Sequence, residues 1–381
     1  MNIKSIKLID YYLGNFLIAC LRPFVFLVGI ILRRDHSLEL RKDITIVKLL
    51  GGGSLVIAFP ALLGLRRKYP DIKINIVTTK GVSQFARSLN IFDNYFEIDH
   101  SSIPKLFVTS IAAYLKTFRC DTIIDLEVHS RLSTVFTLFT AARNRIGFYL
   151  HEAFWRRRTY SHMIFFNTFS GSYEFYDKMF QLFTVSPLST EECREHLLNF
   201  LPRGEKPGKY RICIGHGCSD LSGERMLSVS NWESVFHSRL EKSFKGEVIF
   251  LGARQDEELA EQIINRLSHN FNNIEFINLC GKTSLRESLS ELSLSNEFWG
   301  VDSALNHYAR LLRIECVSFW GPTDPKSYLR HIPDLQEEII YCKIPCSPCI
   351  HVTETPPCKG DNVCIQNLFN DEKREWTGMV T

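Results

Sequence analysis

The chain has no strong excess of charge of either sign. It carries 45 Lys and Arg against 42 Asp and Glu, so the formal net charge is only +3. Nucleic-acid-binding domains usually carry a clear basic excess, so this composition gives no reason to expect nucleic acid as a partner. The sequence also lacks internal repeats and low-complexity tracts. With 45% hydrophobic and 23% charged residues, it has the composition of an ordinary globular protein.

Two common nucleotide-binding motifs are also missing. The turn Gly51-Gly-Gly53 follows a β-rich run at 43–48. It has neither the third glycine of a dinucleotide fingerprint nor the Lys-Ser/Thr pair of a P-loop. We therefore exclude both of these readings for the turn.

Runs of β-forming residues alternate with helical patterns along most of the chain. Such alternation predicts an α/β protein with parallel sheets, and 381 residues are enough for two domains. The alternation restarts after the Pro/Gly-rich, charged stretch 201–208, which we take as the linker. The predicted organisation is a hydrophobic leader at 1–40, domains at 41–200 and 209–340, and a Cys-rich tail with a C-terminal helix at 341–381.

The leader contains two apolar runs, 16–21 and 24–32, which Arg22-Pro23 interrupts. A membrane-spanning helix needs about 20 apolar residues, and a charge in its middle is costly. We therefore expect an anchor at the membrane surface, peripheral or monotopic, with aromatic and basic residues at the headgroups. If the leader spans instead, Arg33-Arg34 predicts that the rest of the chain is cytoplasmic. A helix buried on the domain is the third possibility.

Residues 299–325 place small and hydroxylated residues where two expected strands end. One strand ends at Asp302, and Ser303-Ala304 opens an expected helix that carries His307. The second strand ends in Gly321-Pro-Thr-Asp324. N–H groups at a helix start favour anions, and ligands of open α/β sheets gather at the carboxyl ends of strands. The stretch therefore favours a phosphate site, although an ordinary βαβ turn has the same spacing.

The same stretch resembles the donor-site signature of glycosyltransferase family 9, the lipopolysaccharide heptosyltransferase family. The residues that fit the signature are Asp302, Ser303, His307, Ala309 and the run 321–325. Ala304 stands where the family usually has Gly. The likeness runs from about residue 43 to about residue 368, and the hydrophobic leader is typical of a divergent subset. It implies a GT-B fold, in which two Rossmann-like domains with parallel sheets face an interdomain cleft. It also implies inverting transfer from a nucleotide-diphosphate sugar, with no required cofactor.

Inverting sugar transfer needs a general base near the acceptor hydroxyl. Family members usually have an Asp directly after the first-strand Gly, but here Ser54 follows Gly53, and a hydroxyl is far too weak a base at neutral pH. We therefore predict Glu127, just past a strand end, as the replacement base. Asp125 is the second catalytic candidate, although strand alternation points it to the other face. The alternative is that Glu127 is a surface or capping carboxylate.

Two basic side chains follow the predicted base. His129 and Arg131 could orient a carboxylate or bind an anionic acceptor, and with Gly53 and Ser54 they form the predicted acceptor side.

The departing diphosphate needs cations or N–H donors. We expect the backbone at 303–305, including Ala304, to supply N–H groups, with Thr323 nearby. Arg225 is a further candidate because a guanidinium can clamp phosphate bidentately, and the resemblance aligns it with a family lysine. His307 is expected to touch the donor, and Gly252, at another strand end, to line the base pocket. Arg225 as a solvated loop residue is the alternative.

Five of the 12 cysteines cluster near the C-terminus, and the other seven read as small buried hydrophobes. Since no cleavable secretory signal is evident, a reducing compartment is expected. Cys346, Cys349, Cys358 and Cys364 have spacing suggestive of structural zinc, and the resemblance includes a similar Cys-Ser-Pro-Cys tail. Zinc, a disulfide and free packed thiols all stay open, and no catalytic metal is predicted.

Together these features predict a glycosyltransferase at the cytoplasmic face of the inner membrane. It would move a heptose-like sugar from a nucleotide-diphosphate donor, ADP-heptose by family resemblance, to a lipopolysaccharide core or related glycolipid. Two alternatives stay open. One is a sugar-nucleotide epimerase of GT-B type. The other, suggested by Ser54 and Ala304, is a degenerate nucleotide-sugar-binding or scaffold protein.

Overall fold

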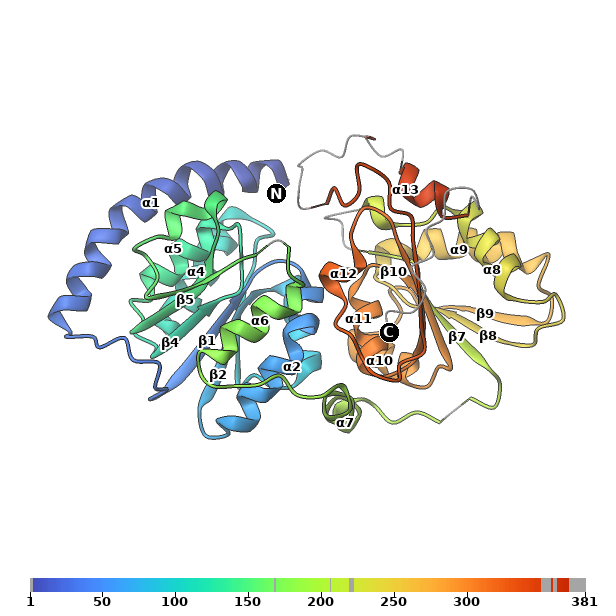
Figure 1. Cartoon of the computed structure of the whole chain (residues 1–381), viewed down its shortest axis with the longest axis horizontal. Helices are drawn as coiled ribbons and strands as arrows, with labels where there is room; N and C mark the ends of the chain where they lie inside the picture. The colour runs from blue at the N-terminus through green and yellow to red at the C-terminus, as the bar shows by residue number, and fades with distance from the viewer. Residues whose placement is uncertain are drawn as a thin grey trace. The chain divides into compact units, whose positions relative to one another are not determined.

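The computed structural model describes residues 3–167, 169–205, 207–218, 223–350, 358 and 362–369. The chain divides into two compact units, Met1–Leu188 and Ser189–Thr381 (Figure 1). The division lies N-terminal to the stretch 201–208 that the sequence suggested as a linker. Of the predicted Cys-rich tail and C-terminal helix, residues 351–357, 359–361 and 370–381 lie outside the described part of the chain.

Unit 1 is built on a parallel sheet with the strand order β3-β2-β1-β4-β5-β6. The strands are β1 Asp43–Lys48, β2 Lys73–Thr79, β3 Asn94–Ile98, β4 Thr122–Asp125, β5 Asn144–Tyr149 and β6 His162–Phe165. The central strand β1 is buried over five of its six residues, as expected when helices cover both faces of a parallel sheet.

The helices of unit 1 cover both faces of this sheet, and the direction in which the chain crosses from strand to strand decides which face each helix covers. They are α1 Ile3–Ile31, α2 Gly52–Lys68, α3 Lys80–Leu89, α4 Ile103–Thr117, α5 Arg131–Phe139 and α6 Ser172–Gln181, with the short 3₁₀ helix η1 His151–Arg156. Right-handed connections put α4 and α5 on one face and α2 and α3 on the other, where α6 also packs against α2. The N-terminal helix α1 packs on α5.

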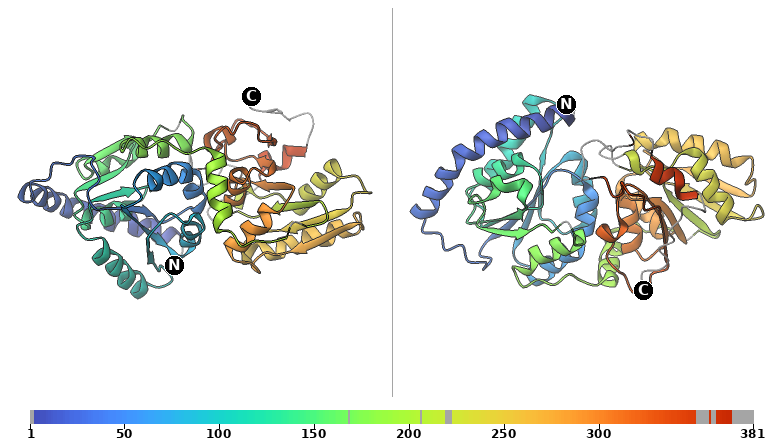
Figure 2. Two further views of the ribbon diagram at one scale, coloured as in Figure 1. Left: turned by 90° about the horizontal axis from the view of Figure 1, so that it is seen from below. Right: turned by 45° about the horizontal axis from the view of Figure 1, so that its top comes forward.

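Unit 2 repeats the design with the parallel order β12-β11-β10-β7-β8-β9. The strands are β7 Arg211–Gly215, β8 Gly246–Phe250, β9 Ile274–Asn278, β10 Glu297–Val301, β11 Glu315–Trp320 and β12 Glu337–Tyr341. The helices are α7 Thr190–Phe200, η2 Gly223–Arg225, α8 Val229–Arg239, η3 Arg254–Asp256, α9 Glu257–Ser268, α10 Leu285–Ser293, α11 Ala304–Leu311, α12 Pro325–Tyr328, α13 Val363–Gln366 and η4 Asn367–Phe369. Figure 2 gives two further views of both units.

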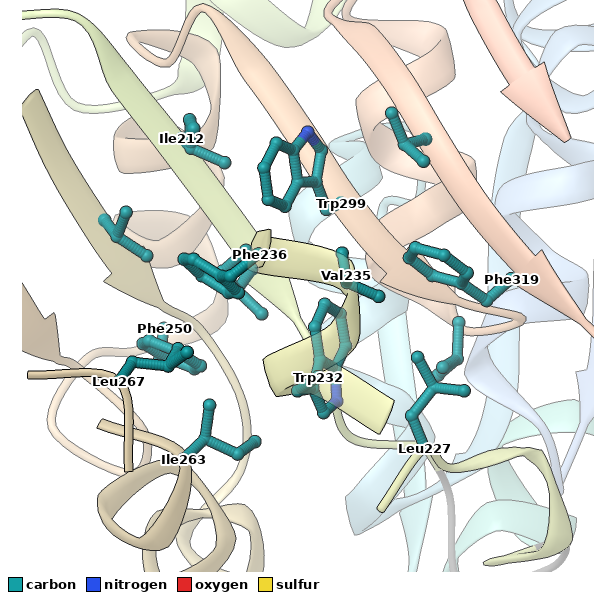
Figure 3. Close-up of a cluster of buried hydrophobic side chains, with 14 of the residues drawn as sticks. Ile212, Leu227, Trp232, Val235, Phe236, Phe250, Ile263, Leu267, Trp299 and Phe319 are labelled. Atoms are coloured by element: carbon teal, nitrogen blue, oxygen red, sulfur yellow. The ribbon is translucent and has the colours of Figure 1, made fainter. Parts of the chain in front are cut away.

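Aromatic side chains fill the core of unit 2 (Figure 3). On α8, Trp232 and Phe236 are completely buried. The Phe236 ring meets Trp299 of β10 at 5.4 Å, and the Trp232 ring meets Phe319 of β11 at 5.6 Å, both edge to face. This packing holds β10 and β11 under α8 and so fixes the strand ends from which the candidate donor residues emerge. The predicted α/β class with two Rossmann-like sheets is therefore confirmed.

Candidate active site

In unit 2 the sheet reverses its strand order between β7 and β10. The chain continues from β7 to β8 on one side, whereas β10 and β11 lie on the other. Ligands of doubly wound sheets bind at the carboxyl edge beside such a reversal. Arg225, in the loop after β7, and Asp302, directly after β10, meet at this point.

Three of the predicted donor residues are in contact there. Arg225 donates from Nη1 to Asp302 Oδ2 at 3.2 Å, and His307 Nε2 lies 3.9 Å from Asp302 Oδ1. The Asp302 and His307 side chains are largely buried, and that of Arg225 is only 16% exposed. Asp302 thus orients the guanidinium of Arg225, and the imidazole of His307 lies beside this pair.

The imidazole of His307 is electrically neutral at physiological pH. Burial lowers its pKa to about 4, against the opposing effect of Asp302, and the charges of Arg310 and Arg225 lower it further. His307 can therefore offer a hydrogen bond to a donor sugar or phosphate but not a positive charge. Arg225 remains the cation of this cluster.

The first turn of α11 adds polar groups that are not satisfied within the described protein. Ser303 is the N-cap residue but makes no side-chain capping bond, and its Oγ is buried without a partner. Thr323, in the turn after β11, likewise has a buried Oγ1 that makes no hydrogen bond within the described protein. Ala304 starts the helix. The N–H groups of a first helical turn favour an anion, so this edge has donors available for phosphate oxygens.

Gly252 belongs to a second group, at the ends of β7 and β8, that the sequence reading largely missed. His216 Nε2 contacts the Asp256 backbone oxygen at 2.9 Å, and a Cβ on Gly252 would lie 2.7 Å from Asp256 Oδ2. The carboxylate of Asp256 accepts a bond from Ala253 N at 2.8 Å. The sequence signals for this group were Gly252 itself and the Gly-His-Gly run at 215–217, which begins with the last residue of β7.

Cys218 connects the two groups of unit 2. Burial raises the pKa of its thiol, and the charges of Arg225, Asp256 and Asp302 all act on it. The carboxyl edge beside the strand reversal is therefore a single polar region.

In unit 1 the predicted base, Glu127, is buried directly beyond β4. Its Oε1 accepts hydrogen bonds from the backbone N–H groups of Leu49 at 2.7 Å and Leu50 at 2.9 Å. The same oxygen lies 3.3 Å from Lys48 Nζ. Burial lowers the pKa of Lys48, but the charges of Glu127 and Tyr176 outweigh this, and the pKa is raised overall. The carboxylate therefore ties the end of β4 to the loop after β1.

Asp125 occupies a different environment from Glu127. It is completely buried and accepts hydrogen bonds from Tyr160 OH at 2.5 Å, Ser133 Oγ at 2.8 Å and Glu127 N at 2.9 Å. Arg156 lies 3.1 Å from the carboxylate. Burial raises the pKa of Asp125, whereas Arg156 and Tyr160 oppose that rise. With all these partners and no solvent access, Asp125 cannot reach an acceptor hydroxyl; its contacts position the Glu127 segment.

The glycine-rich turn follows Leu49 and Leu50, whose N–H groups bind Glu127. Gly51 has a φ of 73°, a left-handed conformation that favours glycine, and Gly53 and Ser54 form the first turn of α2. The Ser54 hydroxyl donates to the Gly51 oxygen at 2.6 Å and also bonds to the buried Tyr176. Ser54 thus fixes the turn, consistent with its being no base.

His129 and Arg131 separate in the structure. His129 is exposed in the loop after β4. The guanidinium of Arg131 stacks over Trp155 at 3.8 Å, donates from Nε to Asn15 at 3.0 Å and pairs with Asp10 at 3.7 Å. Of the two roles predicted for these residues, orienting a carboxylate or binding an anionic acceptor, the contacts of Arg131 are with the Asp10 carboxylate and with other residues that hold α1. A role for Arg131 on the acceptor side stays a prediction.

The four tail cysteines come together in unit 2. Cys346, Cys349, Cys358 and Cys364 line a cavity of about 40 Å³ with Glu224 and Asn362. Within the described ranges, no three His, Cys, Asp or Glu side chains are arranged to hold a metal ion, and the cysteines are free thiols. Burial raises the pKa of the Cys364 thiol to about 12. Structural zinc stays a prediction from the spacing alone.

Comparison with known proteins finds a family similar to unit 2. Residues 206–359 match glycosyltransferase family 9 (heptosyltransferase). The chain is 24% identical over 168 residues to lipooligosaccharide heptosyltransferase 2 of Campylobacter jejuni, strain 81116, covering 43% of this chain and 49% of that protein. The chain thus spans about half the length of the relatives it matches.

Solved structures share the fold over a longer stretch. A family 9 glycosyltransferase from Veillonella parvula is similar with a TM-score of 0.63 and 16% identity, over 80% of this chain and 87% of that one. Escherichia coli heptosyltransferase WaaC with ADP is similar with a TM-score of 0.62 and 19% identity, over 78% of this chain and 92% of that one. WaaC has also been solved with ADP-2-deoxy-2-fluoro heptose. The family match covers β7 to β12, and so the strand ends that carry Arg225, Asp302 and His307. Unit 2 is thus similar to glycosyltransferase family 9, and the two-sheet fold of the chain is the fold of the solved heptosyltransferases.

Proposed function

We propose that this protein is an inverting glycosyltransferase that uses a nucleotide-diphosphate sugar. The observation that carries the proposal is the Arg225–Asp302–His307 contact at the strand reversal of unit 2, inside the segment that matches family 9. A cation, a neutral imidazole and an uncapped helix start are the groups that a departing diphosphate needs.

The donor we favour is ADP-heptose or a closely related sugar nucleotide. The support is the likeness to WaaC, a structure of which holds ADP. The acceptor we favour is a lipopolysaccharide core or related glycolipid, because the Campylobacter relative is named a lipooligosaccharide heptosyltransferase. With such an acceptor the protein would work at the cytoplasmic face of the inner membrane, bound peripherally or monotopically. The donor itself supplies the leaving group, so the proposal needs no cofactor.

In the proposed reaction Glu127 takes the proton of the acceptor hydroxyl. The hydroxyl oxygen attacks the anomeric carbon from the face opposite the diphosphate, and the bond from that carbon to the phosphate oxygen breaks. The nucleoside diphosphate leaves with the electron pair, stabilised by Arg225 and the first turn of α11. Since Oε1 of Glu127 already accepts bonds from Leu49 and Leu50, we assign the proton transfer to Oε2.

The turnover of the Glu127→Gln variant tests the proposed role of Glu127 as the base. With ADP-heptose and a lipopolysaccharide acceptor that lacks heptose, the wild-type protein should release ADP. The variant should lower kcat at least about a hundredfold and still bind ADP in unit 2. Glu39→Gln, which alters a carboxylate with 77% of its side chain exposed in the same unit, should leave kcat unchanged. Unchanged turnover in Glu127→Gln would remove Glu127 from this role. Binding of ADP without any turnover in the wild type would favour the scaffold alternative.

A further inference from the structure

Unit 1 exposes apolar side chains on two helices. On α1, Phe16 is 65% exposed and Ile31 is 75% exposed; on α4, Phe107 is 61% exposed and Leu115 is 66% exposed. The other large hydrophobic residues that these helices expose are Leu8, Tyr11, Tyr12, Leu13, Phe24, Phe26, Leu27, Ile30, Ile103, Val108 and Ile111. So many exposed apolar residues on two helices indicate an interaction surface.

The opposite side of α1 is fastened along α5. Ile18 and Val25 are buried in a cluster with Val135 and Leu138. Asp10 accepts hydrogen bonds from the backbone N–H of Leu132 at 2.8 Å and of Arg131 at 3.0 Å, at the start of α5. A Cβ on Gly14 would lie 2.5 Å from the Arg131 Cβ, so the two helices approach as closely as a glycine permits.

These helices lie on the same side of the sheet. The crossover directions put α4 and α5 on one face, and the Tyr114 ring of α4 meets the Phe139 ring of α5 at 6.0 Å. Since α1 packs on α5 as well, α5 is contacted by both helices. We call the outward surface of α1, α4 and α5 the helical face.

Basic residues outnumber acidic ones around the helical face. The sequences of α4 and α5 contain no Asp or Glu, and the only one in α1 is Asp10, which is 15% exposed and paired with Arg131. Exposed basic residues lie on α4 or just beyond the helix ends and η1: Arg33, Lys105, Lys116, Arg119, Arg157 and Arg158. Two acidic residues also lie near these ends: Asp35 is exposed after α1, and Asp99, before α4, has its carboxylate 3.9 Å from Lys105 Nζ. An apolar surface with basic residues at its margin fits an anionic bilayer, into which the apolar side chains insert while the cations meet the headgroups.

We infer that the helical face docks on an anionic lipid bilayer, with α1 lying in the plane of the membrane and α4 forming a second contact. By length and composition Asp10–Ile31 could cross a membrane, but Arg22 and Pro23 lie in its middle, where a charge is costly. Crossing would strip Ile18 and Val25 from their cluster and separate Asp10 from α5. The inference rests on the membrane association proposed above and not on sugar transfer.

Vesicle binding of the full-length protein tests the role of α4. The wild type should sediment with vesicles that contain phosphatidylglycerol and much less with phosphatidylcholine alone. The double variant Phe107→Ser/Leu115→Ser should bind about tenfold more weakly, since each change removes apolar area from the bilayer contact, without lowering the melting temperature. Leu198→Ser, on the unit 2 helix α7, is the matched control and should bind normally. Equal binding by the α4 variant would overturn the inference. A second outcome would also overturn it: the wild type binds no vesicles but self-associates, and the α4 variant does not self-associate. The surface would then contact a second copy of the chain.

The position of α1 is tested separately by topology. An epitope fused before Met1 and a second epitope after Thr381 should be cleaved by protease on the same side of sealed inner-membrane vesicles. Protection of one epitope while the other is cleaved would show that α1 crosses the bilayer and would overturn the in-plane assignment. Neither assay uses a sugar donor, so failure of the membrane inference and failure of the transferase proposal can be told apart.

Discussion

Lys48 and Glu127 form a buried ion pair, with Nζ 3.3 Å from Oε1. Lys48 ends the first strand of unit 1 and Glu127 follows the fourth, so the pair joins two neighbouring strands at the carboxyl edge of the sheet. The backbone N–H groups of Leu49 and Leu50 share the same carboxylate oxygen. A carboxylate held by three donors has little freedom to move, which suits a base that must meet its substrate in one position.

Lys48→Met is expected to destabilise unit 1 strongly. The change leaves Glu127 buried without its counter-charge, and removing one partner of a buried pair typically costs about 3 kcal/mol or more in unfolding free energy. Urea unfolding measures this loss. Lys73→Met, which alters an exposed lysine at the start of β2, should change the unfolding free energy by less than about 0.5 kcal/mol. Equal effects of the two variants would mean that the Lys48–Glu127 pair contributes nothing.

His307 should make unit 2 less stable in mild acid. Its pKa is about 4 in the folded protein against 6.5 ordinarily, so between these values the unfolded chain binds a proton that the folded chain does not. The contribution of the neutral His307 to the free energy of unfolding is fully present above pH 6.5. It is lost as the pH falls to about 4, and the total loss is about 3 kcal/mol.

His307→Gln should flatten this profile, measured by urea unfolding from pH 4 to 7. Some slope will remain, because burial also lowers the pKa of His216. His331→Gln, at an exposed position in the same unit, should keep the wild-type slope. A wild-type slope in His307→Gln would contradict the assignment of a neutral buried imidazole.

Gly252→Ala is expected to lower the free energy of unfolding of unit 2. The new methyl would lie 2.7 Å from Asp256 Oδ2 and 2.9 Å from Asp256 Cβ, and such overpacking costs about 1–3 kcal/mol. Gly81→Ala is the control, because a Cβ there meets nothing within 4 Å and alanine favours the helix α3 by about 0.5–1 kcal/mol. Urea unfolding of both variants checks the contrast, and a neutral Gly252→Ala would show that this turn relaxes easily.

Local patterns in the sequence sufficed for the α/β class and for part of the site. The runs at 43–48 and 316–320 lie within β1 and β11, because buried parallel strands read as continuous apolar segments. Arg225, Asp302 and His307 were predicted separately, from strand-end chemistry and family resemblance. Their mutual contacts depend on the strand reversal, which no local pattern encodes.

Contacts between distant residues escaped the sequence reading. Glu127 binds the N–H groups of Leu49 and Leu50, 78 and 77 positions away. Arg131 was predicted to orient a carboxylate or to bind an anionic acceptor, and no local pattern predicted its contacts with Trp155 and with Asn15 of α1. The contact between His216 and Asp256 depends on two strand ends lying side by side, and only the folded sheet brings them together.

Nucleotide binding tests the central claim most directly. Thermal stabilisation of the purified protein should be measured with ADP, GDP, UDP and CMP, since a ligand that binds only the folded state raises the melting temperature with the logarithm of its concentration. We expect a clear shift of the melting temperature with ADP and the loss of this shift in Arg225→Ala. No shift with any nucleotide in folded protein, or an equal shift in Arg225→Ala, would contradict the donor site placed at Arg225 and Asp302.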